Sequence, residues 1–562
     1  MSSLSFVQVR SAKSLLVTAA LVTLAVNPST NYDPISVVKL LVLSTCALAL
    51  FFLWISQGSK VLYELGRAEK LFAGGFIFAM VSTVMFSGAP ITQQIFGAFG
   101  RNTGFLAYFS LLVVLIVTSS LRNRDFYQTI PKFLIGVTIP MLAYCGIQIA
   151  GLDPIKWSEF ATFGTLGNIN FLSAFLGLSA VIGFILCFSS SLEKKWRVAA
   201  FTTSTISVPV ILSTGSIQGF VILLAGITFA IGLVLLKYRK YLLFLPFSAL
   251  VIAGVFLTIQ GLANKGILAK FLYQPSVVYR GDYMHAGWEM TLDRPWFGVG
   301  LDSYGDWYRQ ERGEISTLRT GPDRISNSAH NIFLDISSNG GFPLLFFYGG
   351  LLSLALLSSI KYLRASAKMD LNFLALFSAW VAYQIQAAVS INQLGVGVWG
   401  WLFTGALIGY GKINESDLNP APVIGKGKSA KKRKIHNQIP AKAAVAMIAG
   451  SAVGFSLAFI PWNADVKYKS ALQKRVIVEM MKSVDSIGST SFHSELVISA
   501  AMSINAFDQA KETSFRLVRE RPRNFFGWKV ISLLPNVTET ERTTALAKLR
   551  ALDPYNPDIP KS

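Results

Sequence analysis

The chain has 562 residues, of which 52% are hydrophobic and only 14% are charged, and 51 Lys and Arg against 30 Asp and Glu give a formal net charge of +21. Apolar stretches of membrane-spanning length recur along it, so the composition excludes an ordinary soluble protein and indicates an all-α polytopic membrane protein. The positive charge alone would also suit a nucleic-acid-binding protein, so the positions of the cations have to be examined.

Hydropathy predicts about 13 transmembrane helices along the chain. The stretches 35–55, 220–236 and 241–257 are representative of them. The first apolar stretch follows Arg10 and Lys13 and has the outline of a signal peptide, but no convincing small-residue cleavage site comes after it. We therefore expect it to be retained as the first span.

Basic residues gather in every second loop between these spans. They precede the first span and follow the second, fourth, sixth, eighth, tenth and twelfth, where the last group is KGKSAKKRK (426–434). The short loops between carry almost nothing basic beyond Arg101 and Lys156. This positive-inside alternation predicts a cytoplasmic N-terminus and accounts for the net charge without nucleic acid. The segment 259–343 and the tail from 463 then lie outside, and we expect the chemistry on that face.

The cysteines and histidines give no sign of a metal site. Cys46, Cys145 and Cys187 all fall in apolar spans, so we expect neither a disulfide nor a thiolate site. His285 and His330 lie far apart in the outer loop, with no carboxylate-rich run between them. We therefore expect no metal and no cofactor.

The outer loop is dense in side chains that stack on sugar rings or hold anions. Tyr, Trp, Arg and Asp recur through residues 277–313. A carboxylate pair for glycoside hydrolysis could come from Asp293, Asp302, Glu311 or Glu314, although a sequence gives no separation between them. An interfacial aromatic belt is a further interpretation, but it leaves the interleaved Asp and Arg unexplained.

The tail after the last span differs from the rest in its many charges and helical periodicity. It resembles a worn pair of tetratricopeptide-type helices, with Trp528 in one helix and LDPYNP (552–557) after another. A small helical cap without a repeat is the alternative.

Five stretches of the chain carry motifs, and they are, in order, FGRNTGFLAY (99–108), GTLGNINFLSAFL (164–176), YRGDYMHAGWEM (279–290), PWFGVGLDSY (295–304) and SAHNIFLDISSNGGFP (328–343). Together and in this order they resemble the O-antigen ligase and Wzy-type polymerase family, which also includes protein O-oligosaccharyltransferases. The chain departs from the family pattern at two places. Ile217 and Gln218 stand where many members have an arginine, and Ser338 stands where they often have a glutamate.

The resemblance implies a GT-C-like membrane enzyme of the bacterial plasma membrane that uses neither metal nor nucleotide sugar. Such an enzyme takes a glycan from a polyprenyl diphosphate carrier and joins it to a hydroxyl of a glycan, lipid or protein acceptor. The chain then divides into N-terminal spans (1–84), a ligase-like membrane domain (85–410) with the outer loop 259–343, a basic cytoplasmic linker (411–442), a last span (443–460) and the exported tail (461–562). Polymerisation and transfer of a finished glycan both stay open, as does an envelope partner for the tail.

The same resemblance gives roles to particular residues. His330 is the candidate base, because imidazole titrates near neutrality and the acceptor hydroxyl must lose a proton. Arg280 is the candidate cation for the leaving diphosphate. The candidate substrate-binding residues are Arg101, Asn168, Asn170, Gln218, Arg294 and Asn331.

Other interpretations remain at this stage. The histidine and the two asparagines before the span could be helix caps, and Arg280 could reach to lipid headgroups. The whole chain could be a transporter or a flippase for lipid-linked glycans, which would place ionisable residues inside spans. An assembly scaffold that acts through its tail is the third alternative.

Overall fold

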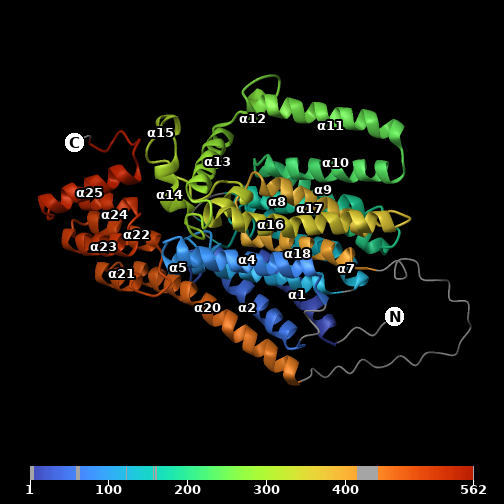
Figure 1. Ribbon diagram of the computed structural model, residues 1–562, viewed down its shortest axis with the longest axis horizontal. Coiled ribbons are helices and arrows are strands. Elements are labelled where there is room, and N and C mark those ends of the chain that lie inside the picture. The colour runs from blue at the N-terminus through green and yellow to red at the C-terminus, as the bar shows by residue number, and fades with distance from the viewer. Residues whose placement is uncertain are drawn as a thin grey trace, which may run out of the picture.

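The computed structural model describes residues 6–58, 64–121, 123–155, 157, 161–413 and 441–560. Within these ranges the chain folds into helices and contains no strand, which confirms the predicted all-α class. Long helices form one bundle, and a small helical tail lies at one end of it (Figure 1). The linker with KGKSAKKRK lies outside the described residues, as do Lys60, Arg122 and Lys156.

Eight of the described helices are long and apolar enough to cross a membrane. They are α2 (Ser36–Ile55), α4 (Arg67–Phe86), α7 (Arg124–Ile149), α8 (Ile169–Leu186), α10 (Gln218–Lys237), α11 (Tyr241–Leu262), α16 (Ile332–Ala365) and α20 (Ala441–Lys474). The shorter apolar helices α6 (Phe105–Ser120) and α18 (Leu394–Tyr410) pack among them, together with α1 (Phe6–Leu24), α9 (Lys194–Ser213) and α17 (Leu371–Ala387). These helices coincide with the segments that hydropathy predicts, and the chain is a multi-pass membrane protein.

Two glycines let α20 approach α2 closely. A Cβ on Gly450 would lie 2.3 Å from the carbonyl oxygen of Leu48, and one on Gly454 would lie 2.3 Å from that of Ser44. Small residues at this spacing allow membrane helices to meet backbone to backbone. The contact fixes α20, which runs on to Lys474 beyond the predicted span and carries the tail.

The outer loop folds into short helices at one end of the bundle. These are α12 (Ala269–Leu272), α13 (Pro275–Asp293), α14 (Tyr304–Glu311) and α15 (Glu314–Thr320), and α5 (Ile91–Phe96) lies near them (Figure 1). The turn from α10 to α11, which carries basic residues, lies at the opposite end (Figure 1). The outer loop and this basic turn therefore lie at different ends of the bundle, and which end faces the cytoplasm stays a prediction from the alternating charges.

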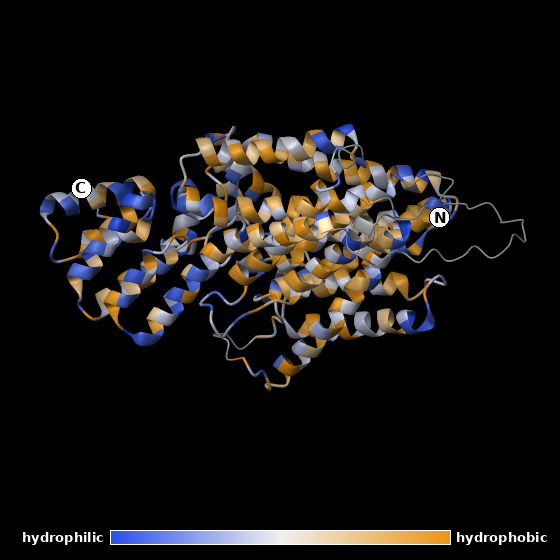
Figure 2. Ribbon diagram, turned by 90° about the horizontal axis from the view of Figure 1, so that it is seen from below, coloured by the Kyte–Doolittle hydropathy of each residue, from blue (hydrophilic) through white to orange (hydrophobic). Residues whose placement is uncertain are grey.

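The tail is built from α21 (Ile477–Val484), α22 (Ser491–Ser503), α23 (Phe507–Glu520), α24 (Phe525–Leu533) and α25 (Glu539–Leu552), each packed on the next. It is more hydrophilic than the bundle (Figure 2). Arg309 of α14 and Arg312, which directly follows α14, both pair with Asp553 after α25, so the tail is fastened to the outer loop. The resemblance to tetratricopeptide helices stays a prediction.

Candidate active site

The PWFGVG turn (295–300) docks into a break in α16. Gly341 interrupts that helix with a φ of 72°, in the left-handed region that favours glycine. Beside the break, the amide of Gly300 donates to the carbonyl of Asn339. A Cβ on Gly298 would lie 2.4 Å from the backbone of Asn339, so a larger residue would push the turn away. The turn thereby holds the start of α14 next to the first turns of α16.

His330 stands just before α16 in a strained backbone conformation. Its φ is 53°, which costs a non-glycine residue about 1–3 kcal/mol. The carboxylate of Asp335 accepts hydrogen bonds from the Ala329 amide (2.8 Å) and the Ser328 hydroxyl (2.7 Å). That hydroxyl accepts in turn from the His330 amide (3.1 Å). Asn331 is the residue that caps α16, so the imidazole of His330 is not needed as a cap.

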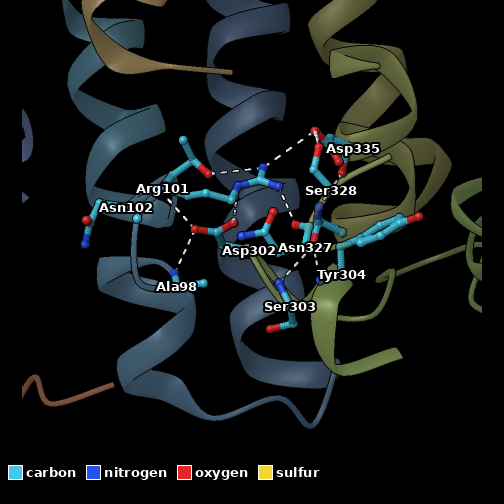
Figure 3. A network of polar contacts seen from close by, with 12 residues as sticks. Ala98, Arg101, Asn102, Asp302, Ser303, Tyr304, Asn327, Ser328 and Asp335 are labelled. Atoms are coloured by element: carbon cyan, nitrogen blue, oxygen red, sulfur yellow. Dashed lines mark hydrogen bonds and ion pairs between the residues drawn. The ribbon is translucent and has the colours of Figure 1, made fainter. Parts of the chain in front are cut away.

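Arg101 lies inside a buried network of polar contacts next to this segment (Figure 3). Its guanidinium is 3.2 Å from the carboxylate of Asp302 and 3.5 Å from that of Asp335. It also donates to the carbonyl of Asn327. The network joins the turn 97–104 to the starts of α14 and α16, and two carboxylates face the single guanidinium.

The imidazole of His330 faces α13. Its ring packs against that of Tyr283, with the centroids 5.2 Å apart. Among the described residues, none forms a hydrogen bond with either ring nitrogen. Burial, together with the positive charges of Arg280 and Arg101, lowers the pKa of His330 to about 4. The ring is therefore neutral near pH 7 and has a lone pair that can accept a proton.

Arg280 lies one turn before Tyr283 on α13, on the same side of the helix. Its Nη1 donates to the carbonyl of Val389, in the turn between α17 and α18, at 3.3 Å. No carboxylate of the described residues comes within 4.0 Å of it, in contrast to Arg101. Burial lowers the pKa of its guanidinium. A half-buried cation without a counter-ion favours the binding of an anion.

The candidates on α8 and α10 differ in their surroundings. Asn168 caps α8 by accepting from the amide of Asn170, whose own side-chain oxygen accepts from a serine hydroxyl in the loop before α10. Gln218 donates to the carbonyl of Val389 at 3.2 Å. Because Arg280 uses the same oxygen, Gln218 lies beside Arg280, whereas Asn168 caps its own helix and Asn170 contacts the loop that leads to Gln218.

Arg294 contacts a different part of the loop. Its guanidinium lies 4.1 Å from the ring centroid of Trp307 on α14, and it donates weakly to the carbonyl of Ser87 (3.4 Å). Arg523 of the tail lies over the same Trp307 ring, at 3.3 Å. The structure thus places Arg294 where the outer loop meets the tail.

Two partners of the site were not predicted from the sequence. Asp335 follows the capping Asn331 by one helical turn, and this spacing could have identified it. Val389 acts through its backbone carbonyl, so its side chain carries no signal. Asp302, considered from the sequence as a carboxylate for hydrolysis, instead pairs with Arg101.

Two of the four candidate carboxylates for hydrolysis have their own neighbours. Asp302 pairs with Arg101. Burial and the neighbouring Asp293 raise the pKa of Glu311 to about 7. In the described part of the chain, no group of three or more His, Cys, Asp or Glu is arranged to hold a metal ion.

Residues 160–349 match the family model described as O-antigen ligase. This segment of the chain is similar to the O-antigen ligase family. It contains Arg280 and His330, while Arg101 lies before it and Val389 after it. No curated protein matches the chain. This similarity supports a membrane enzyme that ligates or polymerises glycans in polysaccharide assembly, as the sequence motifs predict.

Proposed function

We propose that the chain is a metal-independent glycosyltransferase that works at the outer face of the bacterial plasma membrane. It moves a glycan from a polyprenyl diphosphate carrier to a hydroxyl of a glycan, lipid or protein acceptor. The observation that carries this proposal is that Arg280, which no carboxylate in the described part of the chain neutralises, lies close to the neutral imidazole of His330 in one outer loop.

The leaving group requires a fixed positive charge. The bond between the anomeric carbon and the diphosphate oxygen breaks, and the carrier departs as a diphosphate anion. Arg280 suits this role because its fork is permanently charged and donates several hydrogen bonds. Val389 fixes the guanidinium through one nitrogen, and the remaining N–H groups can reach phosphate oxygens.

The acceptor requires a base. As its oxygen bonds to the anomeric carbon, the hydroxyl proton passes to the neutral imidazole of His330. In the free protein the charge of Arg280 helps to keep the pKa of His330 low. The negative charge of a bound donor offsets that field, so donor binding raises the pKa of His330 and strengthens the base.

Arg101 has a different part in this mechanism from the one that its position in the motif suggests. It is already paired with Asp302 and Asp335, and their charges would repel a diphosphate. We therefore assign to Arg101 the positioning of the segment that carries His330.

The transporter alternative needs ionisable side chains inside the spans that could serve a substrate path. Lys39 of α2 is fully buried. Its ammonium group donates to the carbonyls of Val22 (2.8 Å) and Thr23 (2.7 Å), which end α1. Lys39 therefore caps a helix end, and this role accounts for its charge without a transported ion.

Single-turnover transfer by the purified protein tests the proposal. The carrier-linked glycan is supplied with chelator present, and wild-type protein should transfer it while His330→Ala binds it without transfer. Equal transfer by both would overturn the proposal.

Deletion of the gene then distinguishes polymerisation from transfer of a finished glycan. Loss of chain length with single units still attached indicates a polymerase, and loss of all attachment with accumulated carrier-linked chains indicates a ligase.

A further inference from the structure

The tail is bonded to the network that holds His330. Arg521, which follows α23, donates to the side-chain oxygen of Gln93 on α5. The amide nitrogen of Gln93 donates to the carbonyl of Asp302 (3.1 Å) and to the carboxylate of Asp306 (2.8 Å). Gln93 is 7% exposed. Arg521 of the tail thus fixes the orientation of the buried side-chain amide of Gln93, which donates to Asp302.

From Asp302 the contacts continue through Arg101 and Asp335 to Ser328, two residues before the candidate base (Figure 3). The carboxylate of Asp302 pairs with Arg101, and Arg101 pairs with Asp335. Asp335 then accepts from Ser328 and the Ala329 amide, in the segment that leads into His330. All three charged side chains are almost completely buried, so each link acts with little solvent screening.

Other contacts keep the tail in place. The pair between Arg312 and Asp553 is fully buried on both sides, and breaking such a pair is strongly destabilising because it leaves an uncompensated buried charge. Phe492 of α22 stacks on Phe99, and the two ring centroids are 4.3 Å apart. Phe99 comes two residues before Arg101 in the chain. The tail therefore clamps the turn 97–104 and α14 together.

We propose that the tail is part of the catalytic unit, and that Arg521 and Gln93 are positioning residues that set the geometry of His330. This rests on the function proposed above. The left-handed backbone of His330 persists only because its surroundings hold it there. A tail cation that orders the buried network is one of those surroundings.

Two variants test the relay in the full-length protein. Arg521→Ala removes the guanidinium that bonds to Gln93, and Gln93→Met removes the side-chain amide while keeping the length of the side chain. The probe is the native carrier-linked glycan, extracted from cells that make His330→Ala. We expect single-turnover transfer to fall about 10- to 100-fold, because a misplaced catalytic group loses this much, with donor affinity nearly unchanged. Arg521→Lys should restore part of the rate, since it keeps a charge without the fork.

Arg519→Ala is the matched control, because Arg519 is an exposed arginine near the same end of α23. It should transfer at the wild-type rate. The variant with both changes, Arg521→Ala and Gln93→Met, should lose no more than either alone, because both act through one relay. In a His330→Ala background, Arg521→Ala should have no further effect, whereas simple loss of folded protein would lower the residual rate again.

The outcomes distinguish failure of the positioning role from failure of the proposed glycosyltransferase function. Wild-type rates in Arg521→Ala and Gln93→Met, with His330→Ala inactive, would overturn the positioning role alone. Additive losses, or a weaker donor affinity with an unchanged rate, would also overturn it. Full turnover by a folded His330→Ala protein would overturn the proposed function itself.

Discussion

The rings of Tyr283 and His330 are in contact, with their centroids 5.2 Å apart, and Tyr283 stands one turn after Arg280 on α13. Residues three apart share a helix face, so one face of α13 carries the candidate cation and supports the candidate base. A movement of α13 would therefore displace Arg280 and His330 together. Substitution of Arg280 should affect the binding of the donor, and substitution of His330 should affect the transfer step.

His330→Ala should slow transfer strongly without weakening the binding of the donor. We expect a decrease of about 10² to 10⁴ in single-turnover rate, the usual worth of a general base. Donor affinity should persist because Arg280 is unchanged. His285→Ala is the control, since this histidine on α13 is 64% exposed and its contact is with Glu289. A folded His330→Ala protein that turns over like the parent would leave the histidine as a mere helix start.

Arg280 and Arg101 should fail in different ways. Arg280→Lys should weaken donor binding and slow transfer, with thermal stability in detergent close to that of the parent, because no buried carboxylate depends on it. Arg101→Met should lower the stability itself by about 3–5 kcal/mol, because it leaves Asp302 and Asp335 buried and unpaired. The reverse pattern would mean that Arg101 holds the donor.

The contrast between these arginines shows which features of the site can be predicted from the sequence and which depend on the fold. Both were predicted as cations on the outer face, because charge alternation and motif order are local signals. Their roles could not be separated, since Asp302 and Asp335 reach Arg101 only after the chain has folded. The attachment of the tail through Arg312 was invisible for the same reason. Hydropathy, in contrast, depends on contiguous residues and gave the spans well.

The pH dependence should reveal the electrostatic state of His330. A base acts when unprotonated, so activity falls as the pH drops through its pKa. With this pKa at about 4, kcat/KM for the donor should stay nearly constant down to about pH 5.5. An ordinary histidine with a pKa near 6.5 would already have lost about tenfold there. Arg280→Gln removes a nearby positive charge, so its pKa rises and the fall begins at a higher pH. An acid limb near pH 6.5 in the wild type would contradict this.

Transfer should not depend on a divalent cation. The proposed mechanism neutralises the diphosphate with Arg280 and takes the proton with His330, so both charges are handled by side chains. Purified protein treated with EDTA should keep its single-turnover rate. Added magnesium or manganese should not change that rate. Recovery of a chelator-sensitive activity on addition of either ion would count against the mechanism.

Topology can be tested by cysteine labelling in a chain whose native cysteines are replaced. The replaced positions are Cys46, Cys145 and Cys187. Ile315 on α15 is 77% exposed and is a suitable site, whereas its neighbour Ser316 is only 7% exposed and would react poorly. Ile315→Cys should react with a membrane-impermeant maleimide in intact spheroplasts, because the alternating charges put the outer loop outside. Lys195→Cys, at a side chain that is 73% exposed near the start of α9, should react only after permeabilisation. The opposite result would place His330 on the cytoplasmic side, where it could not reach a donor presented at the outer face.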